Sequence, residues 1–189
     1  MDDFTIHGNT FEEAKDNLGK VLKRCINTNV SLSHEKCHML MTEGIVLGHL
    51  ISSKGIEVDP KKIQIIQDLP TPSTQKDVRS FLGHARYYRR FIQNFSKIAS
   101  PLFALLAKDV VFTWTPECQE AFKTIKNKLV TTPVLRGPNW GLPFHIHTDA
   151  SDFSMGAVIG QKEDNLFYSI YYISKNFTGA EVNYTVTEK

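Results

Sequence analysis

The apolar residues between positions 75 and 92 recur at the spacing of one helix face, which predicts an amphipathic α-helix over residues 75–92. These residues are Val78, Phe81, Leu82, Ala85, Tyr88, Phe91 and Ile92. Thr74 and Asp77 give the helix a capping-box-like start. The opposite face carries arginines. Such a stripe is typical either of a solvated surface or of a helix that follows phosphates, since guanidinium groups match phosphate oxygens. Those arginines are Arg79, Arg86, Arg89 and Arg90.

Similar patterns predict four further helices, over residues 11–28, 61–68, 102–107 and 117–129. The first opens on a capping box of Thr10 and Glu13 and stops at Asn29. The third and fourth follow Ser100-Pro101 and Thr115-Pro116, each an N-cap with proline at the first helical position. Two buried faces are expected: Ala14, Leu18, Val21, Leu22, Cys25 and Ile26 in the first helix, and Ala121, Phe122, Ile125 and Leu129 in the last.

Short alternating runs predict strands, which makes the chain α+β. The expected strands lie at 1–6, 30–32, 37–41, 45–51, 56–58, 143–148, 154–161 and 167–174. The last three form an antiparallel meander with a turn at 162–165. The Gly- and Pro-rich stretch 136–142 reads as a tether. Residues 178–189 resemble the first part of a helix.

Net charge, cysteine count and the lengths of the apolar runs bear on whether the chain binds nucleic acid or a membrane. With a net charge of +2 and a pI of about 8.4, any affinity for nucleic acid must come from local placement of charge. Three scattered cysteines suggest a reducing compartment and structural thiols. No apolar run approaches the length of a membrane span, so neither a span nor a signal peptide is expected.

Two acidic or histidine pairs raise the question of metal binding. Asp2 and Asp3 are adjacent; two solvated acids are the simpler interpretation, and magnesium ligands are the alternative. His145 and His147 share one face of a predicted strand, but no third ligand accompanies them, so zinc is not expected there.

Seven motifs occur together in the order of one family. They are Met1-Asp2-Asp3; Glu35-Lys36-Cys37 with Leu47-Gly48-His49; Asp59-Pro60 with Lys62; Ser80-Phe81-Leu82-Gly83-His84; Tyr87-Tyr88-Arg89-Arg90-Phe91-Ile92; Trp114 with Glu117-Cys118-Gln119-Glu120-Ala121-Phe122; and Thr148-Asp149-Ala150-Ser151 with Gly156-Ala157. Along almost its whole length the chain resembles the pol polyprotein of gypsy-type LTR retrotransposons, particularly plant elements. It is similar to the segment from the middle of the reverse transcriptase palm to the start of ribonuclease H.

The resemblance implies four segments. Residues 1–58 correspond to the C-terminal part of the palm, 59–133 to a three-helix thumb, and 134–142 to a tether. Residues 143–189 correspond to the N-terminal β-meander of a truncated ribonuclease H-like domain.

The resemblance also implies the chemistry of an RNA-directed DNA polymerase and a ribonuclease H, each using two Mg²⁺ ions. Asp2 and Asp3 match two palm acids, and Asp149 matches the first metal-binding acid of ribonuclease H. The other family acids have no counterpart here; by register Glu188 is a structural Glu. Leu47, Gly48 and His49 match the primer grip. Gly83 and Tyr87 match thumb residues at the minor groove, with Arg79, Arg86, Arg89 and Arg90 beside them.

With both centres incomplete, the chain alone is expected to lack polymerase and ribonuclease H activity. The alternative is a non-catalytic nucleic-acid-binding remnant of a decayed element, and a third possibility is a product that misfolds. Expected partners are an RNA–DNA hybrid or primer–template duplex and the missing remainder of the polyprotein, with no membrane. The expected location is intracellular, in a cytoplasmic virus-like particle or the nucleus.

Overall fold

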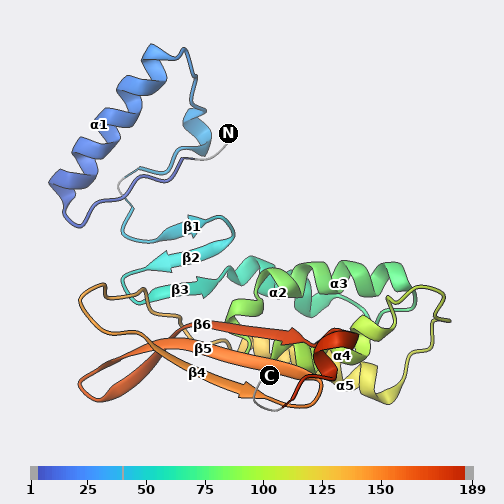
Figure 1. Ribbon diagram of the computed structural model, residues 1–189. Coiled ribbons are helices and arrows are strands. Elements are labelled where there is room, and N and C mark those ends of the chain that lie inside the picture. The colour runs from blue at the N-terminus through green and yellow to red at the C-terminus, as the bar shows by residue number, and fades with distance from the viewer. Residues whose placement is uncertain (1–3, 40, 186–189) are drawn as a thin grey trace.

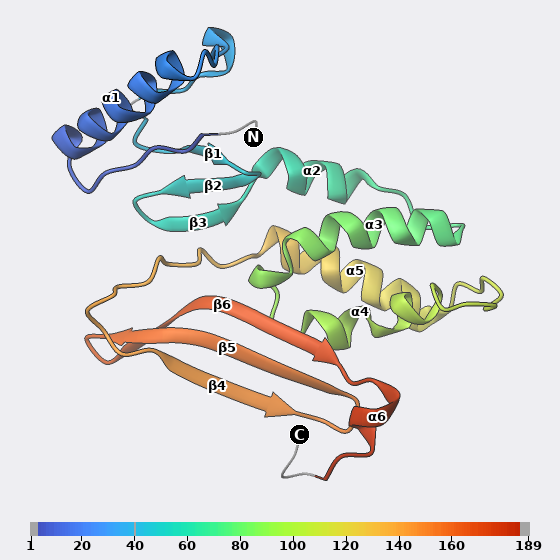
Figure 2. The ribbon, with the colours of Figure 1, turned by 45° about the horizontal axis from the view of Figure 1, so that its top comes forward.

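The computed structural model describes residues 4–39 and 41–185 of the chain, which is mixed α and β (Figure 1). Its elements, in order, are α1 (Phe11–Asn27), η1 (His34–Lys36), β1 (Gly44–Val46), β2 (His49–Ser52), β3 (Gly55–Val58), α2 (Pro60–Asp68), α3 (Gln75–Tyr87), η2 (Arg89–Phe91), α4 (Phe95–Ala104), α5 (Pro116–Val130), β4 (His145–Ala150), β5 (Ser154–Glu163), β6 (Leu166–Asn176) and α6 (Gly179–Val182). Figure 2 shows α2–α5, which we call the helical unit, beside the short sheet β1–β3 and above the long sheet β4–β6. No helix within the described ranges is long and apolar enough to cross a membrane.

The core of the molecule lies in the helical unit, and α3 is at its centre. All seven apolar residues predicted for the buried face of the 75–92 pattern are at most 4% exposed. The capping box is confirmed: Thr74 Oγ1 accepts from the Asp77 N–H at 3.2 Å, and the Asp77 carboxylate accepts from the Thr74 N–H at 2.9 Å. The pattern therefore identified both the start of the helix and the face that it buries.

The single helix predicted over 75–92 is wrong at its C-terminal end. The α-helix stops at Tyr87, and a 3₁₀ turn, η2, follows. Asn94 then adopts a left-handed conformation with φ 58°. This change of direction lets Phe91, Ile92 and Phe95 all remain buried while the chain turns from α3 into α4.

The helix predicted at 102–107 instead spans Phe95–Ala104, so it begins and ends earlier than expected, and Pro101 lies inside it. Phe95, Ala99 and Leu102 are buried at i, i+4 and i+7, which is the spacing of a helix face. Proline inside a helix removes one backbone hydrogen bond. Here the burial of that face outweighs the loss.

The remaining two helices of the unit agree with the sequence. In α5 the predicted residues Ala121, Phe122, Ile125 and Leu129 are all buried, and Thr115 caps the helix by accepting from the Cys118 N–H. Lys126 reaches across to α2, where its ammonium group donates to the Gln67 and Leu69 carbonyls at 2.8 and 2.5 Å. It thereby satisfies carbonyls at the C-terminal end of α2, as the last turn of a helix requires.

The strand predicted at 45–51 is instead two strands of a hairpin. Leu47 and Gly48 have φ of 45° and 67°, and β1 pairs antiparallel with β2 across them. Positive φ at both central residues is the property of a two-residue turn that matches the twist of the strands. The apolar run concealed this turn because Leu47 reads as a strand residue.

The N-terminal segment departs furthest from the predictions. Residues 4–6, 30–32 and 37–39 form no strand. Helix α1 forms as predicted, with Asn29 left-handed beyond its end. Of its six predicted core residues only Cys25 is buried, and Ile26 is 74% exposed, because α1 stands away from the helical unit (Figure 1). Asp2, Asp3 and Glu188 lie outside the described residues.

The predicted meander is confirmed as the antiparallel sheet β4–β5–β6. The stretch expected to be a tether is held at both ends. Ile56 in β3 exchanges two backbone hydrogen bonds with Leu135, at 2.8 and 3.0 Å. Gln161 in β5, fully buried, bonds the Asn139 N–H, the Asn139 and Leu142 carbonyls and the Tyr168 hydroxyl.

Candidate nucleic-acid interface

The end of α3 holds the β1–β2 turn by its backbone. The Tyr87 hydroxyl donates to the Leu47 carbonyl, and the Tyr88 hydroxyl donates to the Gly48 carbonyl at 2.8 Å. His49 Nδ1 lies 2.9 Å from the same Leu47 carbonyl. The structure thus brings Leu47, Gly48 and His49 against Tyr87, which the sequence analysis had named separately as nucleic-acid-binding candidates.

His49 is 9% exposed and is surrounded by the rings of Tyr87, Tyr88 and Phe91 at centroid distances of 5.2 to 5.8 Å. Its Nδ1 donates to the Leu47 carbonyl, which leaves the buried Nε2 without a hydrogen-bond partner. Burial lowers the pKa of His49, and the Arg90 charge lowers it further, against the Leu47 carbonyl, which raises it. A neutral imidazole therefore fixes the turn at neutral pH.

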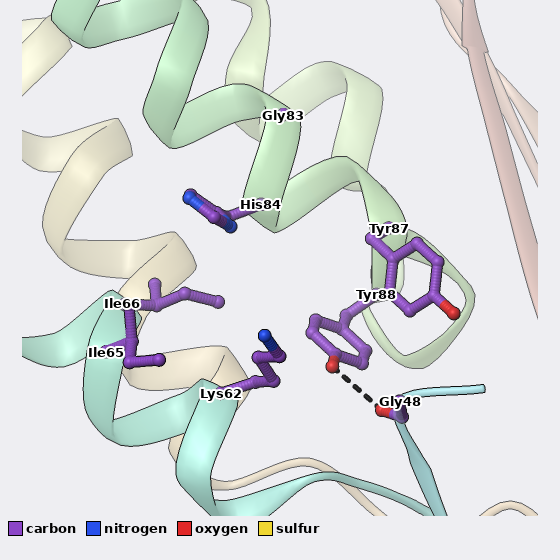
Figure 3. Close-up of a pocket in the computed structure, with 8 residues that line it drawn as sticks. All are labelled: Gly48, Lys62, Ile65, Ile66, Gly83, His84, Tyr87 and Tyr88. Carbon is purple, nitrogen blue, oxygen red and sulfur yellow. Dashed lines mark hydrogen bonds between the residues drawn. The ribbon is translucent and has the colours of Figure 1, made fainter. Parts of the chain in front are cut away.

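A pocket of about 310 Å³ opens between this turn, α2 and α3 (Figure 3). It is lined by Gly48, Lys62, Ile65, Ile66, Gly83, His84, Tyr87 and Tyr88. Lys62 and His84 give it one cationic and one titratable side chain. Both residues belong to the motifs at 59–62 and 80–84, but neither was predicted from the sequence to bind nucleic acid. The signal was available in α2, where Ile63 and Ile66 face the core and leave Lys62 outside it.

The arginines of the α3 region are not equivalent. Arg79, Arg86 and Arg89 are exposed. By helical spacing Arg79 and Arg86 share the face of Gly83. Arg90 is half-buried, and its guanidinium carbon lies 5.0 Å from the centre of the Tyr171 ring in β6. Thus Arg79 and Arg86 flank the pocket face, whereas Arg90 is engaged with the long sheet.

Asp149 lies elsewhere, in β4, paired with Gly156 of β5. It lines a second, smaller pocket of about 100 Å³ with Gln93, Asn94, His147, Thr148, Gly156, Ala157 and Val158. No group of three or more His, Cys, Asp or Glu side chains suited to a metal ion occurs within residues 4–39 and 41–185. The described residues therefore do not by themselves fit the two-metal site that the resemblance implies.

Comparisons with known proteins cover the whole chain. Residues 114–189 match the family described as the RNase H-like domain found in reverse transcriptase. The chain is 38% identical over 189 residues to the retrovirus-related Pol polyprotein from transposon 412 of Drosophila melanogaster, covering all of this chain and 15% of that protein. It is 35% identical over 190 residues to the transposon Tf2-3 polyprotein of Schizosaccharomyces pombe, covering all of this chain and 14% of that protein.

Two solved structures of foamy viral protease-reverse transcriptases are also similar to this chain over nearly its whole length. The foamy viral protease-reverse transcriptase dRH in complex with double-stranded DNA matches with a TM-score of 0.80 and 27% identity, covering 97% of this chain and 32% of that one. The foamy viral protease-reverse transcriptase in complex with an RNA/DNA hybrid matches with a TM-score of 0.76 and 27% identity, covering 95% of this chain and 24% of that one.

These similarities extend over the helical unit and both sheets. The three proteins compared above come from an insect, a yeast and a virus, so the plant-like, gypsy-type origin stays a prediction. Along its whole length the chain is therefore similar to a segment of transposon and retroviral Pol polyproteins, about a seventh of the length of the two transposon polyproteins, and its residues 114–189 match the RNase H-like domain found in reverse transcriptase.

Proposed function

We propose that this segment holds a nucleic-acid duplex for a gypsy-type reverse transcriptase with ribonuclease H, with Leu47–His49 as primer grip and the helical unit as thumb. One observation carries the proposal: the Leu47-Gly48 turn is hydrogen-bonded to the C-terminal end of α3, beside an exposed glycine and two exposed arginines. The foamy viral structures, described as complexes with double-stranded DNA and with an RNA/DNA hybrid, support a duplex as the ligand.

The geometry suits the sugar–phosphate backbone of a duplex. A Cβ added to Gly83 would meet no atom within 4 Å, so the helix surface is open there. Arg79 and Arg86 lie a turn to either side of Gly83, and Lys62 faces the same pocket from α2. Guanidinium and ammonium groups bind phosphate oxygens without reading sequence. We therefore expect binding that depends on duplex shape and charge rather than on sequence.

Catalysis requires more than the described residues supply. A two-metal phosphoryl transfer needs several carboxylates converging on the ions. In the described ranges Asp149 belongs to no group of three or more His, Cys, Asp or Glu side chains that could hold a metal ion. We therefore propose that the segment binds duplex on its own, and that Mg²⁺-dependent polymerisation and RNA cleavage need the remainder of a Pol polyprotein. A hydrolysis or extension step is accordingly not assigned to this chain alone.

Binding to a fluorescently labelled RNA–DNA hybrid tests the proposal. Arg79→Ala with Arg86→Ala should weaken binding and lower the salt dependence, each lost phosphate contact reducing the slope of log K against log salt by about 0.9. Arg24→Ala, at an exposed position of α1, is the matched control and should change neither quantity. Binding that is insensitive to the α3 pair, or equally sensitive to Arg24, would contradict the assignment.

Primer-extension and hybrid-cleavage assays with Mg²⁺ test the catalytic statement separately. The purified chain should show no turnover above a variant lacking Asp2, Asp3 and Asp149. Turnover by the chain that disappears in that variant would show that the chain alone is catalytic and that these carboxylates are required. It would leave the binding proposal standing.

A further inference from the structure

Three contacts join η2 and the first turn of α4 to the long sheet. The Arg90 guanidinium lies over the Tyr171 ring. The Ser96 N–H donates to Ser174 Oγ at 2.8 Å, and Ser96 Oγ donates to the Ser174 carbonyl at 2.9 Å. Both views show α4 beside the sheet (Figures 1 and 2). We call these contacts, with the one at Gly156 described next, the α4–sheet seam.

The fourth contact is a close fit of Asn94 against Gly156. A Cβ added to Gly156 would lie 2.5 Å from Asn94 Oδ1, a separation that real Cβ atoms do not show. Asn94 itself is left-handed, a conformation that asparagine tolerates better than most residues. A residue with a side chain at position 156 would therefore displace the Asn94 side chain from its place in the seam.

The position of this contact is informative because Gly156 is the register partner of Asp149. Asn94 and Gln93 line the same small pocket as Asp149 and His147. The turn after η2 thus meets the long sheet at the pair of strands that carries Asp149. The same turn is continuous, through η2, with the Tyr87 and Tyr88 end of α3.

We propose that Ser96 is a positioning residue which, together with the close fit of Asn94 against Gly156, seats the long sheet on the helical unit as one body, so that Asp149 is held at one distance from the α3 pocket. Neither residue is assigned a contact with substrate. The proposal goes beyond the proposed function because the seam needs no nucleic acid. If a duplex binds on α3, the seam also sets where along that duplex Asp149 can act.

A distance measurement in the absence of nucleic acid tests this. Spin labels are placed at Lys123→Cys in α5 and Lys162→Cys in β5, both exposed positions, on a background of Cys37→Ser with the two buried cysteines retained. The otherwise unaltered chain should give one narrow distance distribution. Gly156→Ala should broaden it, because the new methyl group displaces Asn94.

Two further variants distinguish a loss of the seam contacts from a general loss of folded structure. Adding Asn94→Gly to Gly156→Ala removes the clash and should restore the narrow distribution. Gly19→Ala, at an α1 position where an added Cβ meets nothing within 4 Å, is the matched control and should leave it narrow. A Gly156→Ala distribution that stays narrow, or a double variant that stays broad, would overturn the proposal.

Ser174→Ala keeps the test decisive if Gly156→Ala does not fold. It removes the acceptor of the Ser96 N–H at the start of α4 without adding volume. Broadening is expected in this variant as well. An unchanged distribution would count against the seam, and because no nucleic acid is present, that result would leave the duplex-binding proposal unaffected.

Discussion

Helices α1 and α3 begin in the same way but lie in different surroundings. Each follows a threonine whose hydroxyl accepts from the backbone N–H three residues later, and each has an apolar face. In α3 four residues of that face are buried, whereas in α1 Cys25 alone is. Figure 2 shows α3 packed among the other helices and α1 apart from them.

The difference teaches what an amphipathic pattern does and does not predict. Capping and periodicity are local properties, so they identify a helix wherever it lies. Burial depends on a partner surface, and the described residues around α1 do not supply one comparable to α4 and α5. An apolar face is therefore evidence for a helix, and its burial has to be established separately.

The largest expected effect is the difference in unfolding free energy between two phenylalanine-to-alanine substitutions, one in α3 and one in α1. Phe81→Ala removes a side chain that is 1% exposed and packs on Phe122, so it should lower the free energy of unfolding by about 3–5 kcal/mol. Phe11 in α1 is 62% exposed, and Phe11→Ala should change it by no more than about 0.5 kcal/mol. Urea unfolding measures both. Equal losses would show that α1 belongs to the same cooperative core.

A buried polar side chain extends the comparison to the long sheet. Gln161→Leu would leave the Asn139 backbone groups, the Leu142 carbonyl and the Tyr168 hydroxyl without this partner. We expect a loss of about 2–4 kcal/mol and faster amide exchange at Asn139. The exposed Gln64, which bonds Asp68, is the control, and Gln64→Leu should be close to neutral. If Gln161→Leu leaves the free energy of unfolding unchanged, the side chain of Gln161 does not hold the stretch 134–142 in place.

The two N-caps give a smaller and sharper test. Thr74→Ala should cost about 1 kcal/mol of global stability because α3 is part of the core. Thr10→Ala removes the same type of bond in α1, yet it should mainly fray that helix, which circular dichroism can follow. Similar shifts in the global unfolding midpoint would remove the distinction between the helices.

The smallest effect is a dependence on pH. Burial lowers the pKa of folded His49 below the ordinary value of 6.5, so the unfolded chain takes up a proton first as pH falls. Stability should therefore decrease as pH drops from about 6.5 towards the folded pKa, and be fully present above 6.5. His49→Gln should reduce this slope, and His34→Gln, at an exposed position in the N-terminal segment, should not. Identical slopes in all three chains would exclude His49 as the source.

The sequence predicted the helical unit well because its signals are local. The capping box of Thr74, the face of α3 and the face of α5 were all correct. The errors share a cause in tertiary structure: Pro101 is carried inside α4 by the burial around it, and Leu47 adopts a turn conformation that its apolar character concealed. Neither outcome is encoded in the residues next to it.

The candidate site was predicted as a set of residues but not as an arrangement. Leu47–His49 and Tyr87, which the motifs gave as separate candidates, lie together in the structure, and Asp149 lies in a different pocket. The engagement of Arg90 with Tyr171 and the roles of Lys62 and His84 depend on contacts between distant segments, which no single motif contains. Asp2 and Asp3 lie outside the described residues and stay predictions.

The paired backbone of Ile56 and Leu135 has a consequence for the order of folding. A Cβ on Gly55, whose φ is 136°, would lie 2.3 Å from the Leu135 carbonyl oxygen, so the two chains meet without a side chain between them. The whole helical unit lies between these partners in the sequence. Closing so long a loop costs entropy, which long-range contacts recover only once the intervening chain is compact. During synthesis, Ile56 in β3 therefore cannot pair with Leu135 until α5 and the residues that follow it have been made.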